Sequence, residues 1–247
     1  MKIGLATARF INNDVGFNVK NILKYMQEAK GQNTDLLLFG ECFLQGFEAL
    51  NWNPVNDINI GIERNSDIIM ELTDYCKKIN IALGFGYIEK ENNNLFCSYI
   101  VIDKNGDILT NYKRISKGWR AGSSDDLFYK EGKEFIVFEY MGNKMIVGVC
   151  GDFWTDDIIE IIPKEIDTIL WPTFYSYTKS EWEYFEGEYT RLEFIKQAKK
   201  ISNNIFFVNS ICKEDKCLAY GGAFAIINSE LKFTKEMGEE GILYCDY

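Results

Sequence analysis

The feature that most constrains the fold is a succession of about ten short apolar runs, most of them closed by a polar residue or a turn signal. Only three longer stretches, residues 13–29, 65–79 and 181–202, carry apolar residues at the spacing of one helical face. A single open sheet rarely holds so many strands without splitting into two packed sheets. We therefore expect an α/β protein with two stacked mixed sheets and helices outside them, in one domain over residues 1–247.

The expected strands are separated by recognisable turns. Asn105-Gly106 is a strong hairpin turn, and Gly142-Asn143 turns a second hairpin. A short helix is expected over residues 158–162, whereas residues 116–132 are polar and contain glycine, which is typical of a loop. The runs that we assign to strands are 3–8, 35–39, 81–86, 95–103, 107–112, 135–140, 144–150, 168–171, 205–208, 222–227 and 241–247.

Composition removes the commonest catalytic constellations, because the chain contains no histidine. Ser-His-Asp triads and Cys-His dyads are impossible, and so are zinc and haem sites that depend on imidazole ligands. A cysteine nucleophile in this chain must take its base from a carboxylate, a lysine or a tyrosine. Cys212 and Cys217 have the spacing of half a zinc site, but no second pair completes it, so we expect no metal.

Charge and cysteine usage narrow the partners and the compartment. The net charge of −10 argues against nucleic acid and against an anionic membrane surface. No run approaches the ~18 apolar residues of a membrane helix, and the N-terminus enters a strand without the apolar core of a signal peptide. With seven cysteines, an odd number, this predicts a reduced cytoplasmic protein that binds neither nucleic acid nor membrane.

One cysteine stands where a nucleophile would be useful. The apolar run 145–149 stops at Cys150, and Gly151 follows at once. A thiol at such a strand-to-turn corner is presented at the sheet edge, and the next backbone N–H can face a reacting carbonyl, as in nucleophile elbows. Asp152 is expected to cap a helix or turn that starts near Thr155. The alternative is a buried structural cysteine, which packs as a small hydrophobe.

Two further strand ends carry charged residues that a core does not require. Glu41 stands between the apolar runs 36–39 and 42–44, where a carboxylate needs a partner and could serve as a general base. Lys113 and Arg114 end the strand that leaves the first hairpin. Adjacent strand residues point to opposite faces, so only one of the two can face Cys150. The alternative for all three is solvent-exposed surface.

Taken together, these motifs resemble those of the nitrilase, or carbon–nitrogen hydrolase, superfamily over nearly the whole chain. An apolar strand ends in Glu41, and Cys150 lies in the pattern Gly-x-x-Cys-x-Asp followed by aromatic residues. Residues 111–114, Asn-Tyr-Lys-Arg, are similar to the family's Tyr-x-Lys block with Lys113 as the catalytic lysine. A shift of one residue, which aligns Tyr112 with the family's tyrosine, would select Arg114 instead. Further similar segments are 170–172, 192–198, 203–209 and 221–223.

The resemblance implies a fold and a reaction. The fold is a four-layer α-β-β-α sandwich of two stacked mixed sheets. The reaction is hydrolysis of a small amide or carbamoyl amine by a Glu41-Lys113-Cys150 triad, without metal or organic cofactor. Glu41 would take the thiol proton and Cys150 would form a thioester. Lys113 and the backbone N–H after Cys150 would stabilise the developing negative charge.

Five further residues are expected to contact the substrate. Gly151 would supply the backbone N–H, and Asp125 lies near the place where many family members carry an additional glutamate. Trp119, Phe174 and Tyr175 are aromatic residues in loops or beyond strand ends, where pockets form.

Partners and alternatives complete the prediction. The implied partner is a small-molecule amide-type substrate, and the many aromatic residues predict a homodimer or larger homo-oligomer. The acidic excess favours neutral or amine-bearing substrates over dicarboxylates. A catalytically inactive nitrilase-like binding or scaffold protein and a thioester acyl transferase are the alternatives. The motifs do not distinguish amide, carbamoyl amine and nitrile substrates.

Overall fold

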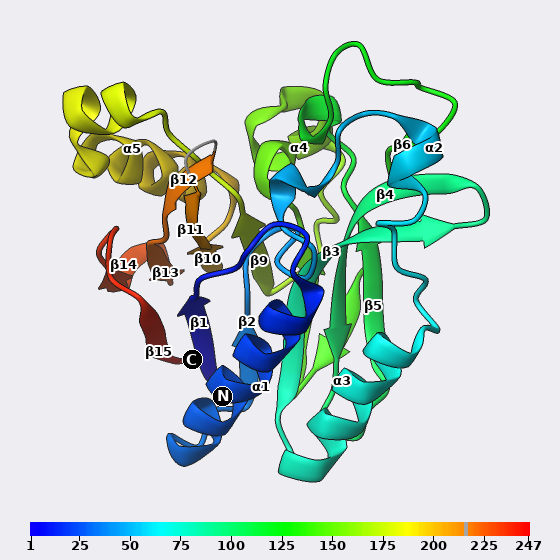
Figure 1. The fold of residues 1–247 in the computed structure, drawn as a ribbon. Coiled ribbons are helices and arrows are strands. Elements are labelled where there is room, and N and C mark those ends of the chain that lie inside the picture. The colour runs from blue at the N-terminus through cyan, green and yellow to red at the C-terminus, as the bar shows by residue number, and fades with distance from the viewer. Residues whose placement is uncertain (215–216) are drawn as a thin grey trace.

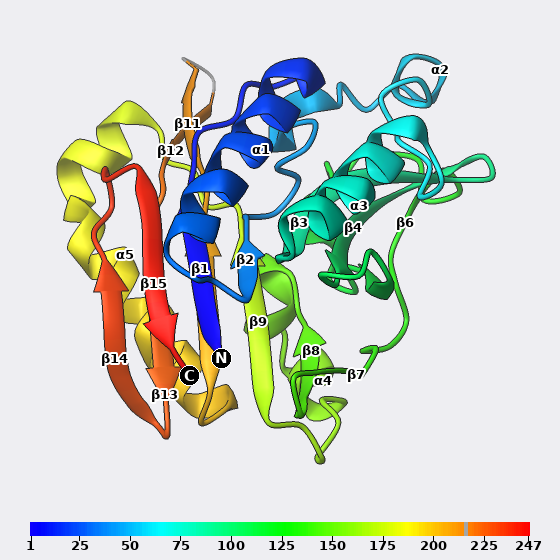
Figure 2. The ribbon, with the colours of Figure 1, turned by 90° about the horizontal axis from the view of Figure 1, so that it is seen from below.

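Two mixed sheets stack face to face, with helices on their outer sides (Figures 1 and 2). The computed structural model describes residues 1–214 and 217–247; for residues 179–180, 182–189 and 217 it describes the backbone alone. The predicted α/β fold with two stacked mixed sheets is confirmed.

The first sheet is built mainly from the N-terminal half of the chain. Its strands are β1 Lys2–Thr7, β2 Leu36–Leu38, β3 Ala82–Glu91, β4 Asn94–Ile102, β5 Ile108–Lys113, β6 Tyr129–Lys130 and β15 Gly241–Asp246. The order is β15-β1-β2-β3-β4-β5, and β6 pairs with β4 outside this path. β1, β2 and β3 are parallel, whereas β3, β4 and β5 form an antiparallel meander. β15 pairs antiparallel with β1, so the two chain termini lie side by side.

The second sheet comes from the C-terminal half. Its strands are β7 Phe138–Tyr140, β8 Asn143–Val147, β9 Thr168–Thr173, β10 Ile205–Asn209, β13 Ala223–Ile227 and β14 Glu230–Lys235. The order is β14-β13-β10-β9-β8-β7, with β8, β9 and β10 parallel at its centre. β11 Ile211–Glu214 and β12 Cys217–Tyr220 form a separate two-stranded ribbon. Parallel strands present their carboxyl ends at one edge, and ligands of open α/β sheets bind there.

Helices cover both outer faces. α1 Val15–Gly31 and α3 Asp67–Ile79 lie on the first sheet, and α5 Lys179–Ile201 lies against the second (Figure 2). The N-cap of α1 is Asp14, whose carboxylate accepts the Phe17 N–H at 2.9 Å. The shorter helical elements are η1 Phe47–Ala49, α2 Pro54–Asp57, η2 Lys117–Trp119, η3 Cys150–Trp154 and α4 Asp156–Glu160.

Several element boundaries differ from those expected. β3 runs on to Glu91, and the predicted strand over 135–140 shortens to β7. The stretch 116–132, predicted as a loop, contains η2 and β6. Among the described residues no helix is long and apolar enough to cross a membrane.

Candidate active site

Glu41 lies at the carboxyl end of β2, and no part of its side chain reaches solvent. The chain turns there because Gly40 approaches the second sheet closely. A Cβ on Gly40 would stand 2.3 Å from the Ser210 Oγ and 2.7 Å from the Thr173 carbonyl oxygen, both too short for any other residue. Glycine at position 40 allows the two sheets to approach closely, and the next residue, Glu41, places its carboxylate between them.

The Glu41 carboxylate is held by three donors from three different elements. Its Oε1 accepts Arg114 Nη1 at 2.6 Å and the Cys97 thiol at 3.2 Å. Its Oε2 accepts the Phe174 backbone N–H at 3.1 Å. A fully buried carboxylate is tolerable only when it is paired in this way.

Arg114, and not Lys113, reaches Glu41. β5 pairs with β4 so that Tyr112 and Arg114 face the second sheet, whereas Lys113 points to the opposite face. There the Lys113 Nζ lies 2.7 Å from Glu91 Oε2. The prediction that places Lys113 beside Glu41 and Cys150 is therefore corrected: the register is the alternative one, shifted by one residue.

The Arg114 guanidinium is almost completely buried and spans the gap between Glu41 and the nucleophile turn. Its Nε donates to Ser116 Oγ at 2.7 Å, and its Nη2 points toward Gly151, where a Cβ would stand 2.5 Å from that nitrogen. Burial by itself would lower the pKa of Arg114, but the charge of Glu41 beside it raises it. Arg114 therefore stays protonated and keeps one donor directed at the residue after Cys150.

Cys150 opens η3 just beyond the end of β8. Its backbone adopts a left-handed conformation, with φ at 46°, which is rare for a residue with a side chain and is typical of a sharp functional turn. Cys150 is partly exposed, and its thiol lies 3.8 Å from the Phe174 carbonyl oxygen. Burial and the charge of Glu41 raise the pKa of Cys150 to about 12, while Arg114 acts to lower it. The resting thiol is neutral, so its proton must pass to a base as the sulfur attacks.

Asp152 holds the nucleophile turn in place. The prediction that it caps a helix near Thr155 is wrong. Its buried carboxylate accepts backbone N–H groups from Val149 at 2.8 Å and from Ser116 at 2.7 Å. It also accepts the Tyr112 hydroxyl at 2.8 Å. Asp152 therefore ties the turn that carries Cys150 to the segment that carries Arg114.

Asn209, which the sequence did not single out, fixes the segment that contacts both Glu41 and Cys150. Asn209 is buried at the end of β10; its Oδ1 accepts the Tyr175 N–H at 3.0 Å and its Nδ2 donates to the Tyr175 carbonyl at 3.1 Å. The preceding residue, Phe174, gives its N–H to Glu41 and its carbonyl to Cys150. The signal was present in the polar end of an otherwise apolar strand, Ile205–Asn209.

A cavity of about 390 Å³ opens directly at the nucleophile. Tyr175, one of the predicted substrate contacts, lines it. The full lining is Cys150, Trp154, Tyr175, Thr190, Glu193 and Phe194. Gly151 lines a neighbouring hollow of about 480 Å³ together with Arg114 and Lys117, and Phe174 lies behind the cavity with only 5% of its surface exposed.

Trp119 and Asp125, the other two predicted substrate contacts, line neither space. Trp119 is buried and packs edge-on against Trp52 and Tyr129. Asp125 caps its own turn, its carboxylate accepting the Leu127 N–H at 2.8 Å. The arrangement gives no support to a substrate contact by either, because Trp119 is packed against Trp52 and Tyr129 and the Asp125 carboxylate is bound within its own turn.

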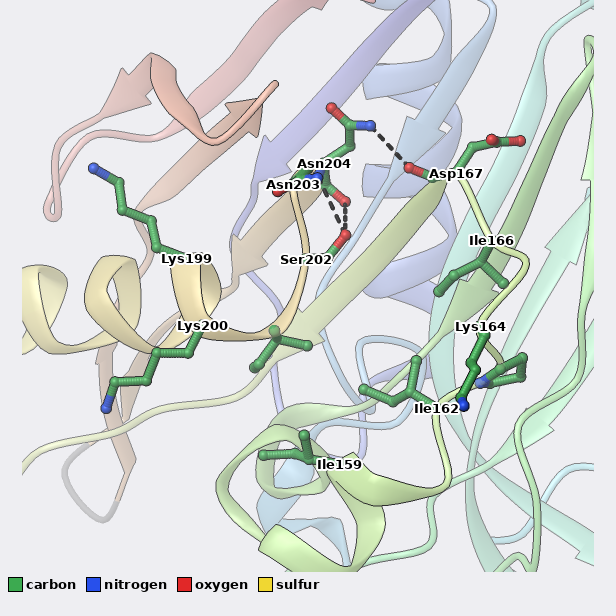
Figure 3. A pocket seen from close by; sticks show the side chains of 12 residues that line it. Ile159, Ile162, Lys164, Ile166, Asp167, Lys199, Lys200, Ser202, Asn203 and Asn204 are labelled. Atoms are coloured by element: carbon green, nitrogen blue, oxygen red, sulfur yellow. Dashed lines mark hydrogen bonds between the residues drawn. The ribbon is translucent and has the colours of Figure 1, made fainter.

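A cavity larger than the one at Cys150 lies elsewhere in the molecule. This cavity, of about 530 Å³, lies between the loop after α4 and the end of α5, where Lys199 and Lys200 project in different directions (Figure 3). It contains none of the residues described above.

The ligand atoms of Glu41, Cys42 and Cys97 lie within 4.8 Å of one another, a spacing that could hold a metal ion. However, Arg114 already occupies this carboxylate, and its positive charge would oppose a cation.

Comparison with known proteins settles the family. The sequence pattern described as Carbon-nitrogen hydrolase matches residues 2–246. The chain belongs to the carbon-nitrogen hydrolase family. The predicted superfamily is thereby confirmed, and with it the predicted enzyme class, a carbon-nitrogen hydrolase.

Individual family members are distant in sequence. A glutamine-dependent NAD(+) synthetase of Acinetobacter baylyi is 21% identical over all of this chain, which covers 44% of that protein. An aliphatic nitrilase of Rhodococcus rhodochrous is 26% identical over 72% of this chain, covering 49% of that protein. The chain thus spans about half the length of these relatives. The solved amidase of Nesterenkonia sp. superposes with a TM-score of 0.80 at 17% identity, covering all of this chain and 90% of that one. This last similarity shows the shared fold.

Proposed function

We propose that the chain hydrolyses a small amide through a thioester on Cys150, with Glu41 as base and Arg114 in the role that the sequence assigned to Lys113. The observation that carries the proposal is the meeting of Glu41, Arg114 and Cys150, from three separate elements, where Cys150 lines a cavity. Solved amidase relatives support it, since one structure of the Nesterenkonia enzyme records addition of acrylamide at its active site cysteine.

The proposed chemistry uses one carboxylate twice. Glu41 takes the thiol proton as sulfur attacks the amide carbon, and the carbonyl oxygen becomes an oxyanion. Arg114 Nη2 and the Gly151 N–H, in the first turn of η3 where backbone N–H groups lack intrahelical partners, stabilise that oxyanion. The C–N bond breaks, and Glu41 returns the proton to the leaving nitrogen. Water then attacks the thioester, again giving its proton to Glu41, and the acid and the free thiol are released.

The test is ammonia release from a panel of small amides, carbamoyl amines and nitriles, together with intact-mass detection of an acyl adduct. Cys150→Ala should fold and lose both signals, because the sulfur is the nucleophile. Cys245→Ala is the matched control, since that thiol is fully buried in the core and should be silent in catalysis. Turnover by Cys150→Ala would refute the thioester mechanism.

A catalytically silent binding protein is the second candidate, and one observation favours it. The Glu41 carboxylate is bound by Arg114 at 2.6 Å, and an arginine in this position restrains a base more firmly than a compact ammonium would. This alternative predicts ligand binding at Cys150 without ammonia release or adduct from any member of the panel.

The assembly remains a prediction. Exposed apolar side chains such as Met141 and Ile161, each with 51% of its surface accessible, are compatible with a homodimer or larger homo-oligomer. Light scattering at micromolar concentration tests it, and a monomer would contradict it.

A further inference from the structure

The cavity at Cys150 has an unusually aromatic wall. Phe194 is buried and forms the floor, with Trp154 and Tyr175 standing edge-on to it at centroid distances of 5.3 and 5.5 Å. Trp154 is 45% exposed and Tyr175 is 37% exposed. Two large rings that remain in water beside a nucleophile are surfaces that a flat apolar group can cover.

The charge of the cavity is equally one-sided. Among the described residues that line it, Glu193 is the one acidic side chain and no cation is present. Glu193 is partly exposed and pairs with Lys196, one helical turn further on. The cations Arg114 and Lys117 line the neighbouring hollow, which shares only Trp154 with this cavity. A carboxylate placed over the aromatic wall would meet Glu193, whose partner Lys196 does not itself line the cavity.

Glu41 lines neither of the two hollows beside the nucleophile. Glu41 is fully buried, and its oxygens are occupied by Arg114, Cys97 and Phe174. Because Glu41 protonates the leaving nitrogen in the proposed reaction, that nitrogen must lie toward Glu41. A bulky substituent on it has no room there, so the acyl group occupies the aromatic cavity and ammonia leaves.

We propose that the substrates are primary amides with an aromatic acyl group whose far end is neutral or carries an amine, and that Trp154 and Glu193 determine this specificity. This inference rests on the proposed function for the reaction at Cys150. It concerns which amide binds, and it can be measured without turnover.

Binding is measured by calorimetry on Cys150→Ala, with Cys150→Ser as a second variant if the first does not fold. The probes are phenylacetamide, its para-aminomethyl and para-carboxy derivatives, propionamide and glutamine. Phenylacetamide should bind about tenfold or more tighter than propionamide, because a ring buries more apolar area. The para-carboxy derivative and glutamine should bind more weakly than phenylacetamide, and the para-aminomethyl derivative at least as tightly.

Variants of the lining assign the effect. In the Cys150→Ala background, Trp154→Ala should remove most of the difference in affinity between phenylacetamide and propionamide. The affinity for propionamide itself should change by less than about threefold. Adding Glu193→Gln should bring the aminomethyl and carboxy derivatives to similar affinity, whereas Glu139→Gln, an exposed carboxylate on β7, should leave their difference intact. Equal or tighter binding of propionamide or glutamine overturns the inference, as does an unchanged preference in Trp154→Ala.

The two proposals fail separately. Tight phenylacetamide binding without ammonia release by the wild-type chain would refute the proposed hydrolysis and leave the binding inference standing. Ammonia release with a kcat/KM for propionamide or glutamine that equals or exceeds that for phenylacetamide would refute the specificity and leave hydrolysis standing.

Discussion

Lys113 and Arg114 are neighbours at the end of β5, and each forms an ion pair with a glutamate at almost the same distance. Lys113 Nζ lies 2.7 Å from Glu91, and Arg114 Nη1 lies 2.6 Å from Glu41. The Lys113 pair is open to water, with 22% and 50% of the two side chains exposed, whereas the Arg114 pair has 3% and 0%. The N–O distance therefore does not distinguish a surface ion pair from one in the candidate site. The face of the strand on which the residue lies, and the burial of that face, distinguish them.

The difference in burial sets the expected energies. A surface ion pair contributes about 0–1 kcal/mol, because water solvates both charges and salt screens them. Removing one partner of a buried pair leaves an uncompensated charge and typically costs about 3–5 kcal/mol. The following predictions use this contrast, and each tests whether Arg114 or Lys113 belongs to the site.

Arg114→Ala should produce the largest effect. Loss of the oxyanion donor should lower kcat by about 10²–10³ or more. Glu41 is left buried and unpaired, so the free energy of unfolding should fall by about 3 kcal/mol or more. Ammonia release and urea unfolding measure the two effects. Lys113→Ala is the matched control, and if it proves the more damaging substitution, the assignment of Arg114 to the site is wrong.

Arg114→Lys sharpens the same comparison, because it places at this position the residue type that the family resemblance predicted. A lysine keeps the charge opposite Glu41 but loses the bond to Ser116 Oγ. We expect kcat within about tenfold of wild type, since charge rather than shape is the main requirement for stabilising an oxyanion. A loss as large as that of Arg114→Ala would show that the guanidinium fork is itself required.

Glu41→Gln should lower kcat by as much as Arg114→Ala, with a smaller effect on stability. The amide is nearly isosteric, so it can still accept from Arg114 and Phe174, but it cannot take the thiol proton. We expect kcat to fall by about 10²–10⁴, the usual contribution of a general base, with only a modest change in unfolding midpoint. Glu91→Gln, the corresponding change on the exposed face, should leave kcat near wild type. Unimpaired turnover by Glu41→Gln would remove Glu41 from the mechanism.

Arg114→Ala should slow the alkylation of Cys150 by roughly tenfold at a given pH. The pKa of Cys150 is raised to about 12 by burial and by Glu41, and Arg114 opposes that rise. A raised pKa means less thiolate at a given pH, so alkylation by iodoacetamide should climb about tenfold per unit between roughly pH 7 and 10 without a plateau. In Arg114→Ala the opposing charge is gone, so alkylation should be slower at every pH. In Lys113→Ala the profile should not move, and a wild-type plateau near pH 8 would contradict the raised pKa.

Much of this architecture can be predicted from the sequence because it follows from interactions between residues that are close together in the chain. Apolar runs predict the strands, and the glycine turn at Asn105-Gly106 predicts the hairpin between β4 and β5. Glu41 and Cys150 stand out because a carboxylate in an apolar run and a cysteine before glycine both need an explanation. Each can be identified without knowledge of its partners.

What the sequence does not show depends on register and on contacts between distant segments. Whether Lys113 or Arg114 faces the site is decided by the pairing of Ser98 with Lys113, and a slip of one residue exchanges the two faces. The same holds for Asp152, which spacing alone predicts to be a helix cap. It is drawn instead to Tyr112 and Ser116, more than 35 positions away in the chain.

Lys113→Ala should give the smallest effect, and it completes the comparison. The Lys113 ammonium pairs with Glu91 and stacks over the Phe96 ring at 4.0 Å from its centroid, so its stem and charge both make contacts. Both contacts are open to water, and we expect a loss of about 0.5–1 kcal/mol in unfolding free energy. The loss should shrink as salt is raised, because an exposed pair is screened. Turnover should stay within about twofold of wild type, since truncating a side chain on the outer face leaves an oxyanion donor on the inner face untouched. Glu91→Ala and the double variant complete a cycle, in which a coupling above about 1.5 kcal/mol would mean that the pair is far less exposed than its geometry indicates.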